Sequence, residues 1–290
     1  MADFQPYDEN NELLNAQYQS DNYMVVHHPR GKKGLCYVYF SGNGLYRADD
    51  AESFRDKILK DDRYEWQHLS ASCKPEKEIF VRDIWLSWYA KGINQNLNSI
   101  DEVATWLKKE CRGYRVTMIG NSAGGYMAIN CAKRMPEIVD RVFSLCGQFS
   151  LLHHNNHTET NHLLTANRNL NDFECFQNTN DLKRVYYLVS YGVDHDRVQA
   201  EYASKIPNLV IIKFDSIRHG VTANNFDYPF LFSMSNQQLD QIGLECRNKM
   251  MKADEFSVML YGKERLVLNK IMEKTRRRMR RIFRGKNDAI

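Results

Sequence analysis

Short apolar segments that end at turn residues recur along the first 220 residues of the chain. Each is four to six residues long, and Gly or Asp follows within a few positions. Nearly continuous apolar runs of this length are typical of strands that are buried on both faces of a parallel sheet. The predicted strands are 35–40, 116–119, 141–146, 185–190 and 209–214.

Several segments between these predicted strands have the sequence features of helices. Ser99 and Glu102 have the spacing of a capping box, and apolar residues follow at helical intervals. A second predicted helix, 123–135, stops at Pro136, and a third, 197–206, stops at Pro207. Strand and helix in alternation predict an α/β fold with a doubly wound, mostly parallel sheet.

Residues 151–181 interrupt this alternation with loops that are rich in Asn and His. We interpret the segment as a lid-like insert within one domain of residues 1–262, followed by a separate helix at 263–290. Four histidines of the insert have the look of a metal cluster, but no Cys or close carboxylate completes a ligand set. We therefore expect a polar insert and no metal; these histidines are His153, His154, His157 and His162.

Composition fits a globular protein, with 43% hydrophobic and 26% charged residues. No apolar run approaches the roughly 18 residues that a transmembrane helix needs, and the polar N-terminal segment does not have the pattern of a signal peptide. The seven cysteines are scattered without a CxxC pair, as expected of reduced thiols. These features predict a cytoplasmic protein.

Charge is distributed unevenly along the chain. Residues 273–290 carry a net charge of +6, whereas residues 1–272 carry −2. The basic residues surround a narrow apolar stripe with steps of three and four, which predicts a basic amphipathic helix. The stripe consists of Leu268, Ile271, Met272, Thr275, Met279, Ile282 and Phe283.

Three roles are open for this tail helix. It could lie on an anionic membrane surface, dock a protein partner or hold an acidic substrate, and packing on the body with a solvated basic face is the simpler alternative. The acidic body argues against a nucleic-acid footprint. We expect the tail to place the protein at the inner face of a membrane and to take no part in catalysis.

The most informative motif is Gly-x-Ser-x-Gly at residues 120–124, with Ser122 at its centre. A predicted strand enters it and a predicted helix leaves it, as in a nucleophile elbow. So sharp a turn strains the backbone of the serine, and side chains two residues to either side would clash, which explains both glycines. A serine that only caps a helix is the alternative, but it would not need both glycines.

With this elbow the chain resembles the α/β-hydrolase superfamily, over roughly residues 35–220. The resemblance implies a triad in the chain order Ser, acid, His, with each partner just after a strand. His219 follows the last predicted strand and is the implied general base. A histidine on a surface loop is the alternative reading of that residue.

Two aspartates compete for the acid of the triad, since both Asp194 and Asp196 follow the strand 185–190. Asp196 has Gln199 three residues later, a spacing that would make Asp196 a helix N-cap with a capping box. We therefore favour Asp194 as the acid and keep Asp196 as the alternative.

The resemblance also implies an oxyanion loop after the first predicted strand, at Ser41-Gly42-Asn43-Gly44. We expect the backbone amides of Asn43 and Ala123 to be the donors, although an ordinary turn would give a similar pattern. Nearby, Trp85, Trp88 and Tyr89 could line a sugar or acyl pocket, but such aromatic residues more often pack in a core.

A serine, histidine and aspartate with an oxyanion hole imply acyl transfer through a covalent acyl-enzyme. The sequence predicts a serine esterase for a small acyl or sugar ester, and an alcohol acceptor would make it an O-acyltransferase. No Gly-x-Gly-x-x-Gly or P-loop is present, and we expect no cofactor. The hydrolase core with its polar lead-in and basic tail also resembles bacterial hydrolase-like proteins of surface-polysaccharide assembly. A catalytically silent scaffold recruited through the tail is a further alternative.

Overall fold

The computed structural model describes residue 4 and residues 8–69, 74–152, 174–220 and 222–287. Eight strands form one sheet in the order β1-β3-β2-β4-β5-β6-β7-β8. Strands β1 and β3 pair antiparallel, and every other neighbouring pair is parallel. The strands are β1 (Tyr23–His27), β2 (Lys32–Phe40), β3 (Pro75–Val81), β4 (Arg115–Asn121), β5 (Val139–Leu145), β6 (Val185–Ser190), β7 (Leu209–Phe214) and β8 (Met250–Met251).

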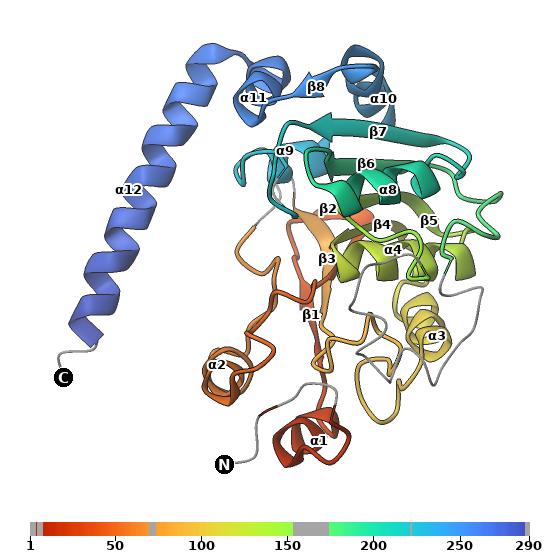
Figure 1. Ribbon diagram of the computed structural model, residues 1–290, viewed down its shortest axis with the longest axis vertical. Helices are drawn as coiled ribbons and strands as arrows, with labels where there is room; N and C mark the ends of the chain where they lie inside the picture. The colour runs from red at the N-terminus through yellow and green to blue at the C-terminus, as the bar shows by residue number, and fades with distance from the viewer. Residues whose placement is uncertain (1–3, 5–7, 70–73, 153–173, 221, 288–290) are drawn as a thin grey trace.

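Helices cover both faces of this sheet (Figure 1), so the prediction of a mostly parallel α/β fold is confirmed. The covering of one face comes from α3 (Ile100–Glu110), α4 (Ala123–Arg134) and α8 (Asp194–Ala203). The other face packs against α9 (Tyr228–Ser233), α10 (Asn236–Cys246) and α11 (Ala253–Tyr261). The other helices of the described residues are α1 (Glu12–Tyr18), α2 (Ala51–Phe54), the π-helix η1 (Arg55–Lys60) and α12 (Lys263–Asn287).

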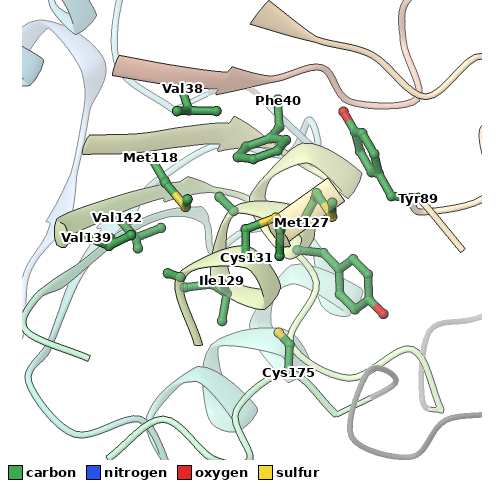
Figure 2. Close-up of a cluster of buried hydrophobic side chains, with 14 of the residues drawn as sticks. Val38, Phe40, Tyr89, Met118, Met127, Ile129, Cys131, Val139, Val142 and Cys175 are labelled. Carbon is green, nitrogen blue, oxygen red and sulfur yellow. The ribbon is translucent and has the colours of Figure 1, made fainter. Parts of the chain in front are cut away.

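Strand β2 shows how the two layers arise. Its side chains alternate, so that Val38 and Phe40 face one core while Tyr37 and Tyr39 face the other. Both sets are buried, because the strand has covered faces on either side, and this accounts for its continuous apolar sequence. Figure 2 shows the first core, where side chains of β2, β4 and β5 meet those of α4.

The predicted elements agree with the structure to different degrees. Strands β6 and β7 have the predicted bounds, and α3 begins at the predicted Ser99 cap. Ser99 Oγ accepts from the Glu102 amide, but Glu102 Oε2 accepts from the Asn98 amide, so the capping box is incomplete. Three strands were not predicted, namely β1, β3 and β8.

A buried arginine joins the sheet to the C-terminal part of the chain. Arg141 lies on β5, and its guanidinium donates to Thr117 Oγ1 at 3.2 Å on the neighbouring strand. It also donates to the carbonyls of Phe232 at 2.8 Å and Met234 at 2.5 Å, at the end of α9. The carbonyls at a helix C-terminus favour a cation, which makes this a suitable place for a buried guanidinium.

Helix α12 runs along the outside of the molecule after α11 (Figure 1). Leu266 is buried near its start, whereas Val267, Leu268, Ile271 and Met272 are each 41–58% exposed. Among the described helices, none combines the length and the apolar character needed to cross a membrane. The predicted boundary at residue 263 and most of the insert remain predictions, since residues 153–173, with the four histidines, lie outside the described residues.

Candidate active site

The turn between β4 and α4 places Ser122 at the edge of the sheet. Its backbone has φ 51° and ψ −121°, a conformation that costs energy in any residue with a side chain. A Cβ on Gly120 would lie 2.1 Å from the carbonyl oxygen of Gly124, and one on Gly124 would lie 2.3 Å from that of Phe40. Both glycines are therefore required by close backbone contacts, as the motif predicts.

Three side chains converge on one another at this edge: Ser122 from the turn after β4, Asp196 from the first turn of α8 and His219 from the loop after β7. His219 Nε2 lies 2.9 Å from Ser122 Oγ, and His219 Nδ1 lies 2.7 Å from Asp196 Oδ1. A carboxylate only accepts, so Nδ1–H donates to Asp196, and Nε2 is then free to accept from the serine hydroxyl. This is the geometry of a Ser-His-Asp triad, with the Asp196 side chain fully buried and the His219 side chain 30% exposed.

The preference for Asp194 as the acid is wrong, because the structure places Asp196 at His219. Helix α8 begins at Asp194, whose side chain is 88% exposed and pairs with Arg197 at 2.7 Å. Asp196, two residues further along the helix, faces inward. Neither aspartate is the N-cap, which is Val193.

A second histidine, His195, contacts the triad. His195 Nε2 lies 3.2 Å from His219 Nδ1 and 3.5 Å from Asp196 Oδ1. No local pattern in the sequence marks His195, because its contact with His219 depends on the direction in which the first turn of α8 faces.

The oxyanion loop leaves the sheet beside the elbow, because Phe40 of β2 pairs with Gly120 of β4. The backbone N–H groups of Asn43 and Ala123 have no hydrogen-bond acceptor within the described part of the chain, whereas the Gly42 N–H donates to Glu65 Oε2 at 2.6 Å. Two unpaired donors on adjoining loops are what an oxyanion hole needs. The structure thus leaves the predicted pair, Asn43 and Ala123, available for that role.

Glu65 ties the oxyanion loop to the elbow and was not predicted. Its Oε2 accepts from the Gly42 amide, and its Oε1 accepts from Asn121 Nδ2 at 3.1 Å. Burial raises the pKa of this carboxyl, while the two hydrogen bonds oppose the rise. Only the fold brings Glu65 to its partners, which lie 23 and 56 residues away in sequence.

The loop of residues 83–89, whose backbone is strained, contacts the oxyanion loop. Burial raises the pKa of Asp83 to about 6, and its carboxylate accepts the backbone N–H groups of Trp85, Ser87 and Tyr89 at 2.7–2.9 Å. In this loop Trp88 and Tyr89 have φ of 51° and 62°. The Tyr89 hydroxyl donates to the Ser41 carbonyl at 2.8 Å.

All three aromatic residues of this loop are buried: Trp85 and Tyr89 are 0% exposed and Trp88 is 5% exposed. They therefore pack in the core, which is the simpler of the two interpretations that the sequence left open.

The acid and base of the triad also lie near a thiol, since Cys146 Sγ, Asp196 and His219 offer atoms within 4.8 Å of one another. Burial raises the pKa of Cys146 to about 12, and its Sγ lies 3.2 Å from Ser190 Oγ. A neutral thiol is a poor metal ligand, and His219 Nδ1 is already paired. This group of residues fits a triad better than a metal centre.

A polar cavity of about 680 Å³ borders the elbow. Its walls include Asn121 and Gly220, the chain neighbours of Ser122 and His219, together with Glu65. Helix α12 contributes Glu273 and Arg276 to the same cavity. The first half of the tail helix therefore borders the cavity next to the elbow.

The strand order and the elbow give an α/β-hydrolase fold, and the contacts at His219 group Ser122, His219 and Asp196 at one edge of its sheet. No family model and no curated protein matches the chain.

Solved structures with a similar fold include a lipase-esterase related protein from Clostridium acetobutylicum (13% identity, TM-score 0.45, covering 73% of this chain and 98% of that one). A peroxisomal α/β-hydrolase from Saccharomyces cerevisiae has 12% identity and a TM-score of 0.45 over 88% of this chain and 89% of its own. The capsule O-acetyltransferase of Neisseria meningitidis serogroup A has 7% identity and a TM-score of 0.46 over 78% and 92%.

Proposed function

We propose that this chain is a serine esterase that cleaves a small acyl or sugar ester through a covalent acyl-enzyme. The observation that carries the proposal is the pair of contacts at His219, 2.9 Å to Ser122 Oγ and 2.7 Å to Asp196 Oδ1. Together they supply a nucleophile, a general base and a group that holds the base in the required tautomer.

In the acylation step, Ser122 Oγ attacks the ester carbonyl while His219 Nε2 takes its proton. The negative charge on the former carbonyl oxygen is stabilised by the N–H groups of Asn43 and Ala123. His219 then protonates the leaving alcohol, and the acyl group remains on Ser122 as an ester. In the deacylation step, water attacks the acyl carbonyl while His219 Nε2 takes its proton. His219 then returns a proton to Ser122 Oγ, and the carboxylic acid is released.

An alcohol in place of that water would yield an O-acyltransferase with the same residues, and a scaffold without activity would leave the serine unreactive. Both are outcomes that one experiment separates from ester hydrolysis.

A fluorophosphonate probe tests the nucleophile directly. We expect covalent labelling of Ser122 in the folded protein, located by mass spectrometry of the modified peptide, and loss of labelling after denaturation in urea. Short-chain nitrophenyl esters and acyl-CoA donors, each with and without sugar alcohols, then report hydrolysis or transfer. A folded protein that the probe leaves unmodified would contradict the proposal and favour the silent scaffold.

We further propose that α12 holds the enzyme on an anionic membrane surface. Four apolar side chains near its start are 41–58% exposed, and eight Lys or Arg residues lie between 273 and 290. An apolar stripe beside dense positive charge is suited to the boundary between lipid headgroups and acyl chains.

Neutralising part of this charge should weaken binding to anionic vesicles. In the variant Arg280→Gln/Arg281→Gln/Arg284→Gln we expect a loss of about 3 kcal/mol, or roughly 100-fold in affinity, at about 1 kcal/mol for each charge. Co-sedimentation with phosphatidylserine vesicles measures this, and binding of the unmodified protein should weaken as salt rises. Ester turnover should persist, because none of these residues belongs to the proposed triad or oxyanion hole.

The matched control removes three exposed cations from the body in the variant Lys109→Gln/Arg112→Gln/Lys249→Gln. It has the same net charge as the tail variant and should bind vesicles as the unmodified protein does. Equal losses in the two variants, or no binding by any form, would reject the membrane role.

A further inference from the structure

A buried amide lies beside the nucleophile. Gln148 follows β5, is 1% exposed, and directs its Nε2 at Ser122 Oγ from 3.5 Å. That distance is at the outer limit of a hydrogen bond, and contacts of this kind in an unliganded site tighten when charge develops on the acceptor.

The orientation of this amide is fixed by its other neighbour. The indole Nε1–H of Trp88 donates to Gln148 Oε1 at 3.0 Å. Because an indole nitrogen only donates, the oxygen of the amide must face Trp88, and the NH₂ group must face Ser122. The same NH₂ group donates to the Cys146 carbonyl at 3.4 Å.

The loop that carries Gln148 is held by a second buried amide. Gln199 of α8 accepts the N–H groups of Phe149 at 2.6 Å and Ser150 at 2.9 Å through Oε1. Its Nε2 donates to the Ser150 carbonyl at 2.9 Å. Buried polar groups with this many partners hold one arrangement, so the distance from Gln148 to Ser122 is set by the fold.

We propose that Gln148 is a further catalytic residue, whose N–H donates to Ser122 Oγ when the serine leaves the acyl group. This inference rests on the proposed esterase function. In the acyl-enzyme, Oγ is an ester oxygen and a weak acceptor. When the tetrahedral intermediate collapses, the C–Oγ bond breaks, its electron pair stays on Oγ, and His219 Nε2 returns a proton to it.

The hydrogen bond from Gln148 is therefore stronger in this transition state than in the acyl-enzyme, and only such a difference accelerates a step. In the free enzyme, Oγ is a hydroxyl oxygen and already accepts well. Acylation consequently gains less from Gln148 than deacylation does.

The test is Gln148→Met, which retains the length of the side chain and removes the donor. With a nitrophenyl ester in rapid mixing, we expect deacylation to slow by about 10- to 100-fold, the range for a hydrogen bond to a charged group. The values of kcat and KM should fall together, kcat/KM should change little, and a burst of one nitrophenol per enzyme should appear or grow.

Two companion variants make the test specific. Trp88→Phe retains Gln148 but removes the N–H that orients it, so deacylation should slow by a smaller factor. Gln241→Met makes the same chemical change on the exposed side of α10 and should alter neither step. If Gln148→Met does not fold, the deacylation rate of Trp88→Phe still tests the role of Gln148.

The possible results are distinct. Normal deacylation in folded Gln148→Met, or equal slowing of acylation and deacylation, would overturn the role of Gln148 while leaving the esterase function in place. An unmodified protein that neither reacts with a fluorophosphonate nor hydrolyses esters would overturn the proposed function itself.

Discussion

Replacing Ser122 with Ala should lower the turnover of a responsive ester by about 10⁶-fold, the loss that removal of a triad nucleophile causes. The Ser122 side chain contacts His219 and Gln148 through its Oγ alone, and Ala fits the same backbone at φ 51° no worse than Ser does. The free energy of unfolding should therefore change little. Steady-state kinetics and urea unfolding of the purified variant measure the two effects separately.

Ser204→Ala is the matched control, because it makes the same change at an exposed serine just after α8. It should retain full activity. A folded Ser122→Ala protein with unchanged turnover would show that ester cleavage does not pass through this serine.

Asp196→Asn should reduce kcat by about 10⁴-fold, the effect of removing the charge that orients a triad histidine. The carboxylate of Asp196 is fully buried and accepts the His219 Nδ1–H at 2.7 Å. An amide at this place retains the shape but neither stabilises the imidazolium that forms during the reaction nor holds one tautomer. The kcat of the variant with a nitrophenyl ester, together with a thermal melt, separates a catalytic loss from unfolding.

Asp194→Asn is the paired experiment, since it changes the same residue type on the same helix turn. Its side chain is 88% exposed and contacts Arg197, so we expect activity close to that of the unmodified protein. The opposite ranking of the two variants would mean that the acid is not the residue that the geometry indicates.

The sequence predicted the parts of the fold whose signals are local. Apolar runs identified five strands, and the two glycines around Ser122 reported a backbone constraint that the structure contains. Strand β3 was not predicted because Lys77 and Glu78 interrupt its apolar pattern. Both are buried, with Lys77 paired to Glu110 and Glu78 to His28, and such distant partners leave no mark on a local pattern.

The acid of the triad was misassigned for a related reason. Asp196 and Gln199 have capping-box spacing, yet both side chains serve tertiary contacts, to His219 and to the loop after Gln148. Glu65 and Gln148 likewise act on residues 23 to 60 positions away. Positions of this kind follow only from the packing of strands that are distant in sequence.

Arg141 makes the assembly of the catalytic centre depend on a part of the chain that is synthesised after it. Ser122, Asp196 and His219 all precede residue 220, but the guanidinium on β5 has its carbonyl partners at Phe232 and Met234. A nascent chain that ended before α9 would lack both carbonyl partners and the helices that cover this face of the sheet, so the guanidinium and the apolar side chains of the face would be exposed to water. The segment from α9 onward must therefore leave the ribosome before this face of the sheet can be buried, and the three triad residues are synthesised before that point.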